Sequence, residues 1–468
     1  MEPYRIMLVS VCNPTNWKDV RSPNLGLAYL ASSIRKHLPG IKFLFRIVNK
    51  NIFYEANKFR PHLIGLSTFS PTFQYAIHYI NKLAVRKIPI ILGGPHISVL
   101  PCCLPKNATA AVLGEGENTF TELVKTALDG PIKPNNLSSI QGIAFWDRDT
   151  LIETEPRPRI QNLDILSPPA RDLIPVHPHT SMITSRGCPY RCTFCLTSPF
   201  WDTIRYHSAE YVGNEIEMLV RKFKVKFISF YDDLFIGKQE RLVEIIHILE
   251  KRGLLGKISF SCNARVDLVN DKLISLLVRL GVKYVTMGLE SGDDETLKYL
   301  KGGDITVSQN QHAIRILQKN GIKINAYFII GSPLETQEKL DRTYNFIRKA
   351  NIDLISVNCL SPFPGTPVWE YAKENGLVSE ESFDWSLMEN NVTGSSQNLN
   401  KFICLSRYLD KEQLFKQFKR FRRLETRRNF SRIWKHPLRG YILRMSFKIA
   451  QTYLRNRLRN SQQEVKIS

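Results

Sequence analysis

Short apolar runs alternate with helical patterns in two blocks of the chain. In the first block the runs are rich in β-branched residues and are followed by turn residues, which predicts strands. These strands lie at 5–11, 42–48, 62–68, 88–93 and 109–114, and helices are predicted at 25–37, 72–86 and 117–128. Such alternation is typical of a parallel sheet covered by helices. Residues 1–130 are therefore predicted to form a flavodoxin-like (Rossmann-like) α/β domain.

The second block, within residues 179–378, repeats the strand and helix pattern six times. Strands are predicted near 181–186, 226–232, 257–263, 283–290, 323–331 and 352–360, with helices near 208–222, 238–252, 269–280, 305–319, 335–349 and 367–375. Repetition of this kind requires parallel strands with right-handed crossovers. It predicts a partial (β/α)6 barrel of the TIM type, with its chemistry at the carboxyl ends of the strands. Residues 131–178, rich in proline, are predicted to connect the blocks and to hold one short strand at 140–146.

The last segment, residues 379–468, is expected to be a basic α-helical region. From Lys401 to Ser468 there are 19 Lys and Arg against 4 Asp and Glu, so +15 of the net charge of +22 lies here. An apolar row at helical spacing is interleaved with basic residues. The row comprises Leu414, Phe415, Phe418, Phe421 and Leu424, and a second such segment is expected from Tyr441 to Leu458.

This basic region has three interpretations. The helices either pack on the barrel with a solvated basic face, attach to anionic membrane lipid, or bind nucleic acid. No recognised RNA-binding module accompanies the charge, so no nucleic-acid partner is expected. Residues 6–11 are too short for a signal or a membrane span. Nine cysteines, an odd number, favour a reducing cytoplasm over a secreted disulfide framework. The protein is expected in the cytoplasm, peripheral on the inner membrane face if the tail attaches there.

Three cysteines, Cys188, Cys192 and Cys195, fall within eight residues at C-x3-C-x2-C spacing. Soft sulfur ligands so close together select zinc or an iron–sulfur cluster. A structural zinc site needs a fourth ligand, and the nearest, His207, lies well downstream. The incomplete set indicates a cluster with one open iron. The alternative is three buried or disulfide-bonded cysteines, which the neighbouring Arg and Gly residues of an exposed, positively biased loop disfavour.

This spacing, with Phe194 directly before the last cysteine, resembles the cluster loop of the radical S-adenosylmethionine (SAM) family. The resemblance implies a [4Fe–4S] cluster whose fourth iron is chelated by the amino and carboxylate groups of SAM. Polar groups at the other predicted strand ends then become candidate SAM ligands. Asp232 and Glu290 could bind the ammonium or ribose, and Arg265 offers a fork for the carboxylate. The set expected to contact SAM is Phe194, Asp232, Arg265, Glu290, Ser291 and Gly331.

Turn residues also gather at the strand ends of the first block, where ligands of open parallel sheets bind. Glycines there let the backbone approach a large flat or phosphorylated ligand. The residues are Ser67, Thr68, Gly93, Gly94, Gly114, Glu115 and Gly116. The stretches Pro23 to Leu30, Gly93 to His96 and Gly114 to Glu117, in that order before the three cysteines, resemble the cobalamin-binding domain of cobalamin-dependent radical SAM enzymes. The D-x-H-x-x-G motif is missing, which implies no histidine below cobalt. His96 would substitute, but such a residue more often caps a loop.

The resemblance implies radical chemistry at a site shared by the two domains. SAM cleavage would yield a 5′-deoxyadenosyl radical, with electrons from a donor such as flavodoxin or ferredoxin. The leading hypothesis is methyl transfer to an sp3 carbon or phosphinate phosphorus of a small or lipidic substrate. Oxidative cyclisation, as in anaerobic magnesium-protoporphyrin monomethyl ester cyclases, is the alternative. Transfer-RNA methylthiolation is less favoured, because the N-terminal domain lacks a second set of three clustered cysteines. A non-catalytic cobalamin- or lipid-binding role is less favoured, because the set at Cys188, Cys192 and Cys195 is intact.

Overall fold

The first domain is a twisted sheet whose parallel core has the flavodoxin strand order. A computed structural model describes residues 2–13, 24–303, 305–380, 383–388, 399 and 402–433. The sheet order is β2-β1-β3-β4-β5-β6-β7, and its first five strands are parallel. These are β1 (Tyr4–Ser10), β2 (Phe43–Val48), β3 (Leu63–Ser67), β4 (Ile90–Gly93) and β5 (Ala110–Val112). The predicted fold class is confirmed for this domain.

Helices cover both faces of this sheet because its strands are apolar on both sides. Ile6 and Leu8 of β1 pack in a core with α1 and α5, whereas Met7 and Val9 pack on the other face with α2 and α3. The helices are α1 (Leu25–His37), α2 (Ile52–Phe59), α3 (Phe73–Ala84), α4 (Pro95–Val99), α5 (Gly116–Asp129) and α6 (Pro134–Leu137). The sequence prediction missed α2 and α4. Of the motif Pro23 to Leu30, Pro23 lies outside the described residues.

The proline-rich connector adds two strands to the same sheet. β6 (Ile143–Asp147) runs antiparallel to β5, and β7 (Thr150–Glu153) runs antiparallel to β6. The strand predicted at 140–146 is thus present, and it widens the sheet instead of standing alone. The boundaries at residues 130 and 178 stay predictions.

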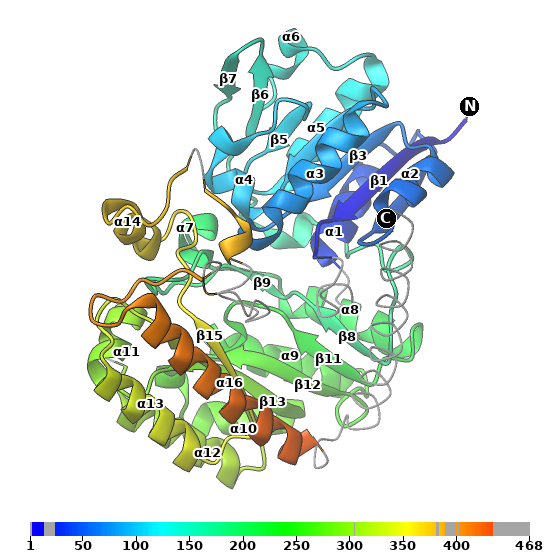
Figure 1. Cartoon of the computed structure of the whole chain (residues 1–468). Helices are drawn as coiled ribbons and strands as arrows, with labels where there is room; N and C mark the ends of the chain where they lie inside the picture. Colours follow the sequence, from blue (N-terminus) through cyan, green and yellow to red (C-terminus); the bar gives the residue numbers. More distant parts are fainter. Residues whose placement is uncertain are drawn as a thin grey trace, which may run out of the picture.

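The second domain is an open barrel of six parallel strands in the order β15-β14-β13-β12-β11-β8. The strands are β8 (His179–Met182), β11 (Phe227–Phe230), β12 (Ser259–Ala264), β13 (Val282–Glu290), β14 (Lys323–Ile330) and β15 (Leu354–Cys359). The helices are α7 (Thr197–Trp201), α8 (Ala209–Arg221), α9 (Gln239–Lys251), α10 (Asp271–Leu280), α11 (Asp294–Lys301), α12 (Val307–Lys319), α13 (Gln337–Lys349) and α14 (Pro367–Glu374). The partial barrel is confirmed, and the first domain sits above it in Figure 1.

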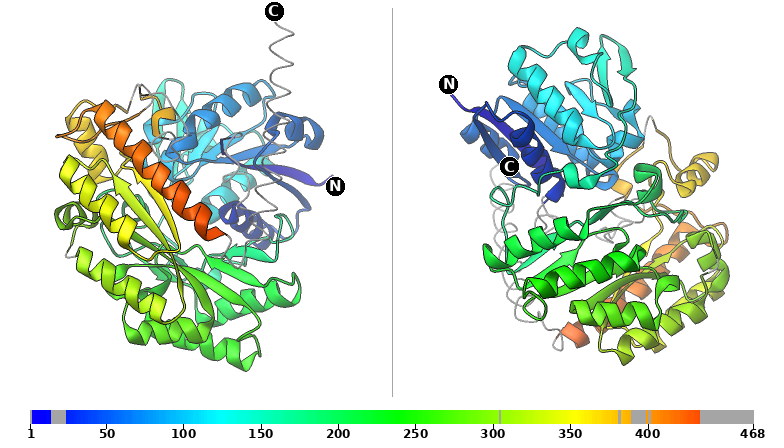
Figure 2. Two further views of the ribbon diagram at one scale, coloured as in Figure 1. Left: turned by 60° about the horizontal axis from the view of Figure 1, so that its bottom comes forward. Right: turned by 180° about the vertical axis from the view of Figure 1, so that it is seen from behind.

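Helix α16 (Lys411–Ile433) lies across the open edge of the barrel, next to β15 (Figures 1 and 2). The Asn429 side chain accepts a hydrogen bond from Ile355 N at 3.0 Å and donates one to Ile355 O at 2.8 Å. Glu425 accepts one from Val357 N at 3.0 Å. An edge strand needs such partners because its free backbone groups otherwise invite aggregation. Helix α16 therefore closes the sheet edge with side chains.

The apolar row predicted in the basic region is buried against the barrel. Leu414, Phe415, Phe418 and Phe421 are all at most 9% exposed and belong to the barrel core. Helix α16 thus packs on the barrel with a solvated basic face, which is one of the three interpretations. The segment from Tyr441 to Leu458 lies outside the described residues. Among the helices that the structure describes, none has the length and apolarity required to cross a membrane.

Candidate active site

The three cysteines lie on a loop that leaves the barrel after β8 and is closed at its base by a two-residue ribbon. β9 (Ser185–Arg186) pairs antiparallel with β10 (Arg205–Tyr206), and residues 187–204 between them form what we call the cysteine loop. Gly187 has φ +92°, and a Cβ there would lie 2.3 Å from Thr203 O. Glycine is therefore required where the two ends of the loop meet.

Neighbouring side chains and helix α11 support the cysteine loop inside the barrel. Thr193 N donates to Leu300 O of α11 at 2.9 Å. Arg265 Nη1 lies 3.5 Å from Cys192 Sγ, and its guanidinium stacks 3.8 Å from the Tyr190 ring centre. Lys301 Nζ lies 5.9 Å from the ring centre of Phe194. The structure thus places two predicted SAM residues, Arg265 and Phe194, beside the cysteines.

The three cysteines are half-buried. Burial raises the pKa of the Cys188 thiol to about 11 and also raises the pKa of Cys195. Ligation by iron would therefore have to displace protons from these sulfurs. Among the described residues, no three His, Cys, Asp or Glu side chains converge on a single ion. A [4Fe–4S] cluster does not require its ligands to converge on one ion, because each cysteine thiolate binds a different iron atom of the cluster.

A cavity of about 940 Å³ lies between the two domains, and we call it the active-site cavity. From the first domain it is lined by Ser67, Gly93, Gly94, Gly114, Glu115 and Gly116, which together form the glycine-lined edge. From the barrel side it is lined by Phe194, Cys195, Thr197, Trp201, Tyr231 and Asp233. Its depth is apolar, with Leu30, Leu66, Leu92 and Phe120 in the wall. The predicted cobalamin edge and the cysteine loop therefore face one space.

The glycines of this edge fit a large ligand lying against the backbone. A Cβ at Gly114 would meet no atom within 4 Å, and a Cβ at Gly93 would make only ordinary contacts, the nearest at 3.9 Å. Side chains at these two positions would thus take up space that the cavity now leaves open. Gly94 differs, because a Cβ there would lie 2.3 Å from Thr68 O. Thr68 does not line the cavity and instead packs beneath Gly94, so its predicted contact with cobalamin is not supported.

His96 does not reach the active-site cavity. Its ring is fully buried, with Nδ1 3.0 Å from Ser70 Oγ and stacking contacts to Phe73 and Trp385. Burial lowers the pKa of His96 to about 3, so the imidazole is neutral. His96 therefore caps the turn at Ser70, as expected for most histidines in such a loop.

Of the two adjacent carboxylates at the end of β11, the one that faces the cavity is Asp233. Asp232 is buried, and both of its carboxylate oxygens accept hydrogen bonds from Thr184. Asp233 lines the cavity and accepts a hydrogen bond from Thr197 Oγ1 at 3.1 Å, two residues after Cys195. The predicted contact of Asp232 with SAM is therefore not supported by its position, since Asp232 does not line the cavity.

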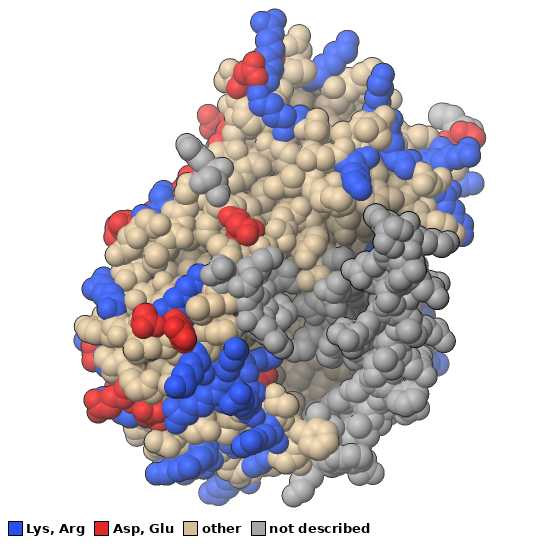
Figure 3. Space-filling model, in the orientation of Figure 1, with Lys and Arg blue, Asp and Glu red and all other residues tan. Residues whose placement is uncertain are grey.

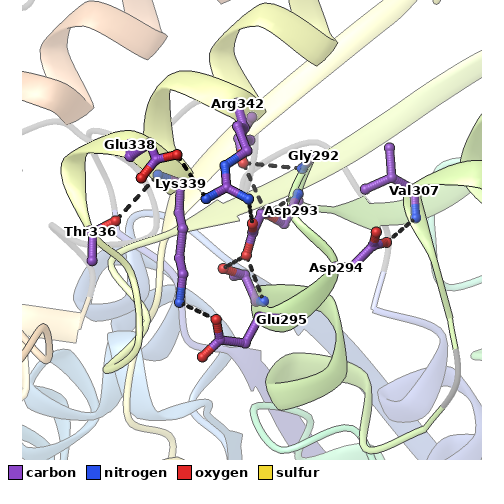
Figure 4. A network of polar contacts seen from close by, with 12 residues as sticks. Gly292, Asp293, Asp294, Glu295, Val307, Thr336, Glu338, Lys339 and Arg342 are labelled. Atoms are coloured by element: carbon purple, nitrogen blue, oxygen red, sulfur yellow. Dashed lines mark hydrogen bonds and ion pairs between the residues drawn. The ribbon is translucent and has the colours of Figure 1, made fainter.

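The remaining predicted SAM residues have protein partners. Glu290 Oε1 binds Lys301 Nζ at 2.7 Å. Ser291 Oγ lies 2.9 Å from Thr343 Oγ1 and accepts a hydrogen bond from Asp293 N at 3.2 Å. Asp293 precedes α11 and binds Arg342, as Figure 4 shows. A Cβ at Gly331 would lie 2.9 Å from Leu414 Cδ2, so the position is required by packing against α16. None of these three residues lines the active-site cavity, and their contact with SAM stays a prediction.

Comparisons with known proteins agree with this arrangement. Residues 20–124 match the family model of the B12 binding domain, and residues 182–347 match that of the radical SAM superfamily. An uncharacterized methyltransferase of Pyrococcus horikoshii is 33% identical over 81% of this chain and 85% of its own. The chain belongs to the cobalamin-dependent radical SAM enzymes. The [4Fe–4S] cluster, SAM and cobalamin expected from the sequence are the cofactors of this family.

Two further relatives differ in what they share with this radical SAM enzyme. The anaerobic magnesium-protoporphyrin IX monomethyl ester cyclase of Cereibacter sphaeroides is 28% identical over 70% of this chain, but over only 55% of its own length. The solved structure of the radical SAM methyltransferase TsrM from Kitasatospora setae, with cobalamin and a [4Fe–4S] cluster bound, superposes with a TM-score of 0.63. The superposition covers 81% of this chain and 76% of the TsrM chain. At 17% sequence identity it shows a similarity of fold.

Replacing one cysteine of the loop should remove the cluster. Cys192→Ala, reconstituted anaerobically with iron and sulfide, should lack the brown colour and the iron of the native protein, because an exposed iron then has too few protein ligands. Cys404→Ala is the matched control, since Cys404 is also half-buried and free but lies in another part of the barrel. Equal iron contents in the two variants would contradict the assignment.

Filling the glycine-lined edge should weaken cobalamin binding without unfolding the domain. Gly93→Leu adds a side chain where only ordinary contacts await its Cβ, so it should occupy the cavity and lower cobalamin affinity by tenfold or more, about 1.4 kcal/mol. Equilibrium dialysis with hydroxocobalamin measures this effect. Gly40→Leu, in an exposed turn of the same domain with no atom within 4 Å, should bind cobalamin as the native protein does.

Proposed function

We propose that the enzyme transfers a methyl group to an unactivated carbon, or to phosphinate phosphorus, of a small or lipidic substrate. One observation carries the proposal: Cys195 and the glycine-lined edge line the same cavity. When bound, SAM and the cluster supply a 5′-deoxyadenosyl radical, and cobalamin supplies a methyl group. Both can act on one substrate only when their sites share a space.

The residues of the chain contribute binding, orientation and exclusion of water. The apolar wall of Leu30, Leu66, Leu92 and Phe120 suits an apolar ligand surface and keeps water away from it. Asp233 is a carboxylate at the barrel side of the cavity, where it could receive the SAM ammonium. Arg265 remains the candidate partner for the SAM carboxylate, although Asp267 already pairs with it at 2.9 Å.

The relatives support methyl transfer over other outcomes. The Pyrococcus horikoshii relative carries a methyltransferase name and matches most of both chains. The cyclase matches only about half of its own length, and this favours shared cofactor domains over a shared whole-protein activity. Oxidative cyclisation remains the second candidate because that relative is 28% identical over 70% of this chain.

The two candidates leave different products. With SAM, a low-potential reductant such as flavodoxin or ferredoxin, and a cell extract as substrate source, anaerobic methyl transfer should accumulate 5′-deoxyadenosine and S-adenosylhomocysteine together. Cyclisation should accumulate only 5′-deoxyadenosine. Chromatography of both nucleosides from the native enzyme and from Cys192→Ala, which should form neither, separates the outcomes. Deoxyadenosine without S-adenosylhomocysteine would exclude methyl transfer.

We further propose that the exposed basic face of α16 contacts the anionic surface of a membrane. Lys416, Lys419, Arg423 and Arg427 are exposed on one side of the helix, and Lys and Arg side chains gather over this part of the barrel in Figure 3. Each basic residue near an anionic bilayer contributes about 1 kcal/mol. A peripheral location on the inner membrane face follows from this contact.

Charge reversal tests the membrane contact. Changing these four residues to Glu should abolish cosedimentation with phosphatidylglycerol vesicles at low salt, because attraction becomes repulsion. The matched control reverses four exposed lysines of the first domain: Lys58, Lys82, Lys125 and Lys133. It changes the net charge equally, so equal loss of vesicle binding in both proteins would contradict a specific role of α16.

A further inference from the structure

The cysteine loop has two arginines at its base, one on each strand of the ribbon that closes it. Arg186 and Arg205 are direct partners in the β9–β10 pairing. Two cations opposite each other on a ribbon repel, so this arrangement needs carboxylates close to both. We call Arg186 and Arg205 the arginine base. The barrel does not supply the carboxylates that bind it.

Two glutamates of the first domain bind the arginine base. Arg186 Nη1 lies 2.7 Å from Glu115 Oε1, and Arg186 Nη2 lies 2.5 Å from Glu117 Oε1. Arg205 Nη1 lies 2.8 Å from Glu115 Oε2. All four side chains are at most 9% exposed. The cluster is therefore balanced in charge, almost fully buried, and shared between the two domains.

The same glutamates belong to the wall of the active-site cavity. Glu115 lies between Gly114 and Gly116 of the glycine-lined edge, and Glu117 is in the first turn of α5. Trp201, the last residue of α7 in the cysteine loop, has its ring 5.6 Å from the guanidinium of each arginine. One short segment of the first domain thus lines the predicted cobalamin side and holds the base of the cysteine loop.

The electrostatics of the cluster favour the charged forms of Arg186 and Glu115. Burial by itself would lower the pKa of Arg186. The neighbouring carboxylates of Glu117 and Glu115 outweigh this effect and raise that pKa above its usual value. Burial would raise the pKa of Glu115, but Arg205 and Arg186 hold it below the usual value. Removing Glu115 leaves Arg205 without a carboxylate, and removing Glu117 leaves Glu115 as the single carboxylate for both arginines. Either change gives the buried cluster a net positive charge, which favours movement of the arginine base toward water.

We propose that Glu115 and Glu117 are positioning residues that hold the base of the cysteine loop against the glycine-lined edge. They touch neither the cysteines nor the reacting atoms, and act through Arg186 and Arg205. The inference rests on the proposed function in one part only, namely the expected change in the ratio of reaction products. Its structural part, a cysteine loop tethered by the first domain, stands on the contacts of the chain alone.

The structural part can be tested on the iron-free full-length protein by thiol alkylation. In Glu117→Gln, Glu115→Gln and the double variant, iodoacetamide should modify Cys188, Cys192 and Cys195 about tenfold faster than in the native protein, because the untethered loop opens more often. Mass spectrometry gives the rate for each cysteine. Glu117→Asp, which retains the charge on a shorter side chain, should lie between the native protein and Glu117→Gln.

The matched control removes a buried carboxylate elsewhere. Glu215 binds Arg171 at 2.6 Å, with side chains 0% and 2% exposed, and neither residue belongs to the cysteine loop. Glu215→Gln therefore leaves a comparable buried guanidinium without its ion pair, and its cysteines should be alkylated at the native rate. Equal acceleration in this control would mean general destabilisation, and unchanged rates in the Glu115 and Glu117 variants would mean no tether. Either result overturns the proposal.

Product ratios then separate this inference from the proposed function. With cluster and cobalamin loaded to native content, the Glu117→Gln enzyme should make about tenfold more 5′-deoxyadenosine per S-adenosylhomocysteine than the native enzyme, since a displaced loop uncouples SAM cleavage from transfer. If the native enzyme forms no S-adenosylhomocysteine, the proposed methyl transfer is contradicted. The alkylation rates still test whether Glu115 and Glu117 hold the base of the cysteine loop. An unchanged ratio alongside faster alkylation would overturn the link between the tether and the reaction.

Discussion

Four buried charges between the domains are the constraint on which the active site depends. Glu115, Glu117, Arg186 and Arg205 leave water only if the two domains meet in one register, because each charge finds its partner on the other side. Removing one partner of such a pair costs about 3–5 kcal/mol, whereas replacing the whole set by apolar residues can be neutral. The cluster therefore contributes orientation more than net stability. An apolar interface alone tolerates sliding, and sliding would separate the cysteine loop from the glycine-lined edge.

The barrel restrains the cysteine loop from the opposite side through α11. Leu300 O accepts from Thr193 N, and the start of α11 is fixed by Asp293, which caps the helix and binds Arg342 at 3.0 Å (Figure 4). Ser291 and Gly292 both bond to Thr343 Oγ1 in the same network. Ser291, which was predicted from the sequence to bind SAM, thus helps to hold helix α11, and α11 supports the cysteine loop. A ligand role would have to be added to this structural one.

Local patterns were enough to predict the parallel strands of both domains and most helices, because the alternation of apolar runs and helical patterns is a property of neighbouring residues. The short strands β7 and β10 were not predicted. Helix α2 escaped prediction since it begins after Asn51, which is left-handed and makes no capping bond. The choice between Asp232 and Asp233 could not be made from a local pattern, because both residues follow β11, which ends at Phe230, and strand alternation does not extend to them. The arginine base and its glutamates lie about 70 to 90 residues apart, and no local pattern pairs them.

The basic region shows how one composition can serve separate physical purposes. Arg428 donates to the carbonyl oxygens of Ile347, Ala350 and Ile352, and so acts as part of the barrel. The apolar row of α16 is buried in the same core, and inserting it into lipid would uncover the β15 edge that Asn429 and Glu425 satisfy. Membrane insertion of α16 would thus cost the protein its own sheet closure. What remains for a membrane is charge, so contact through α16 has to be superficial and weakened by salt.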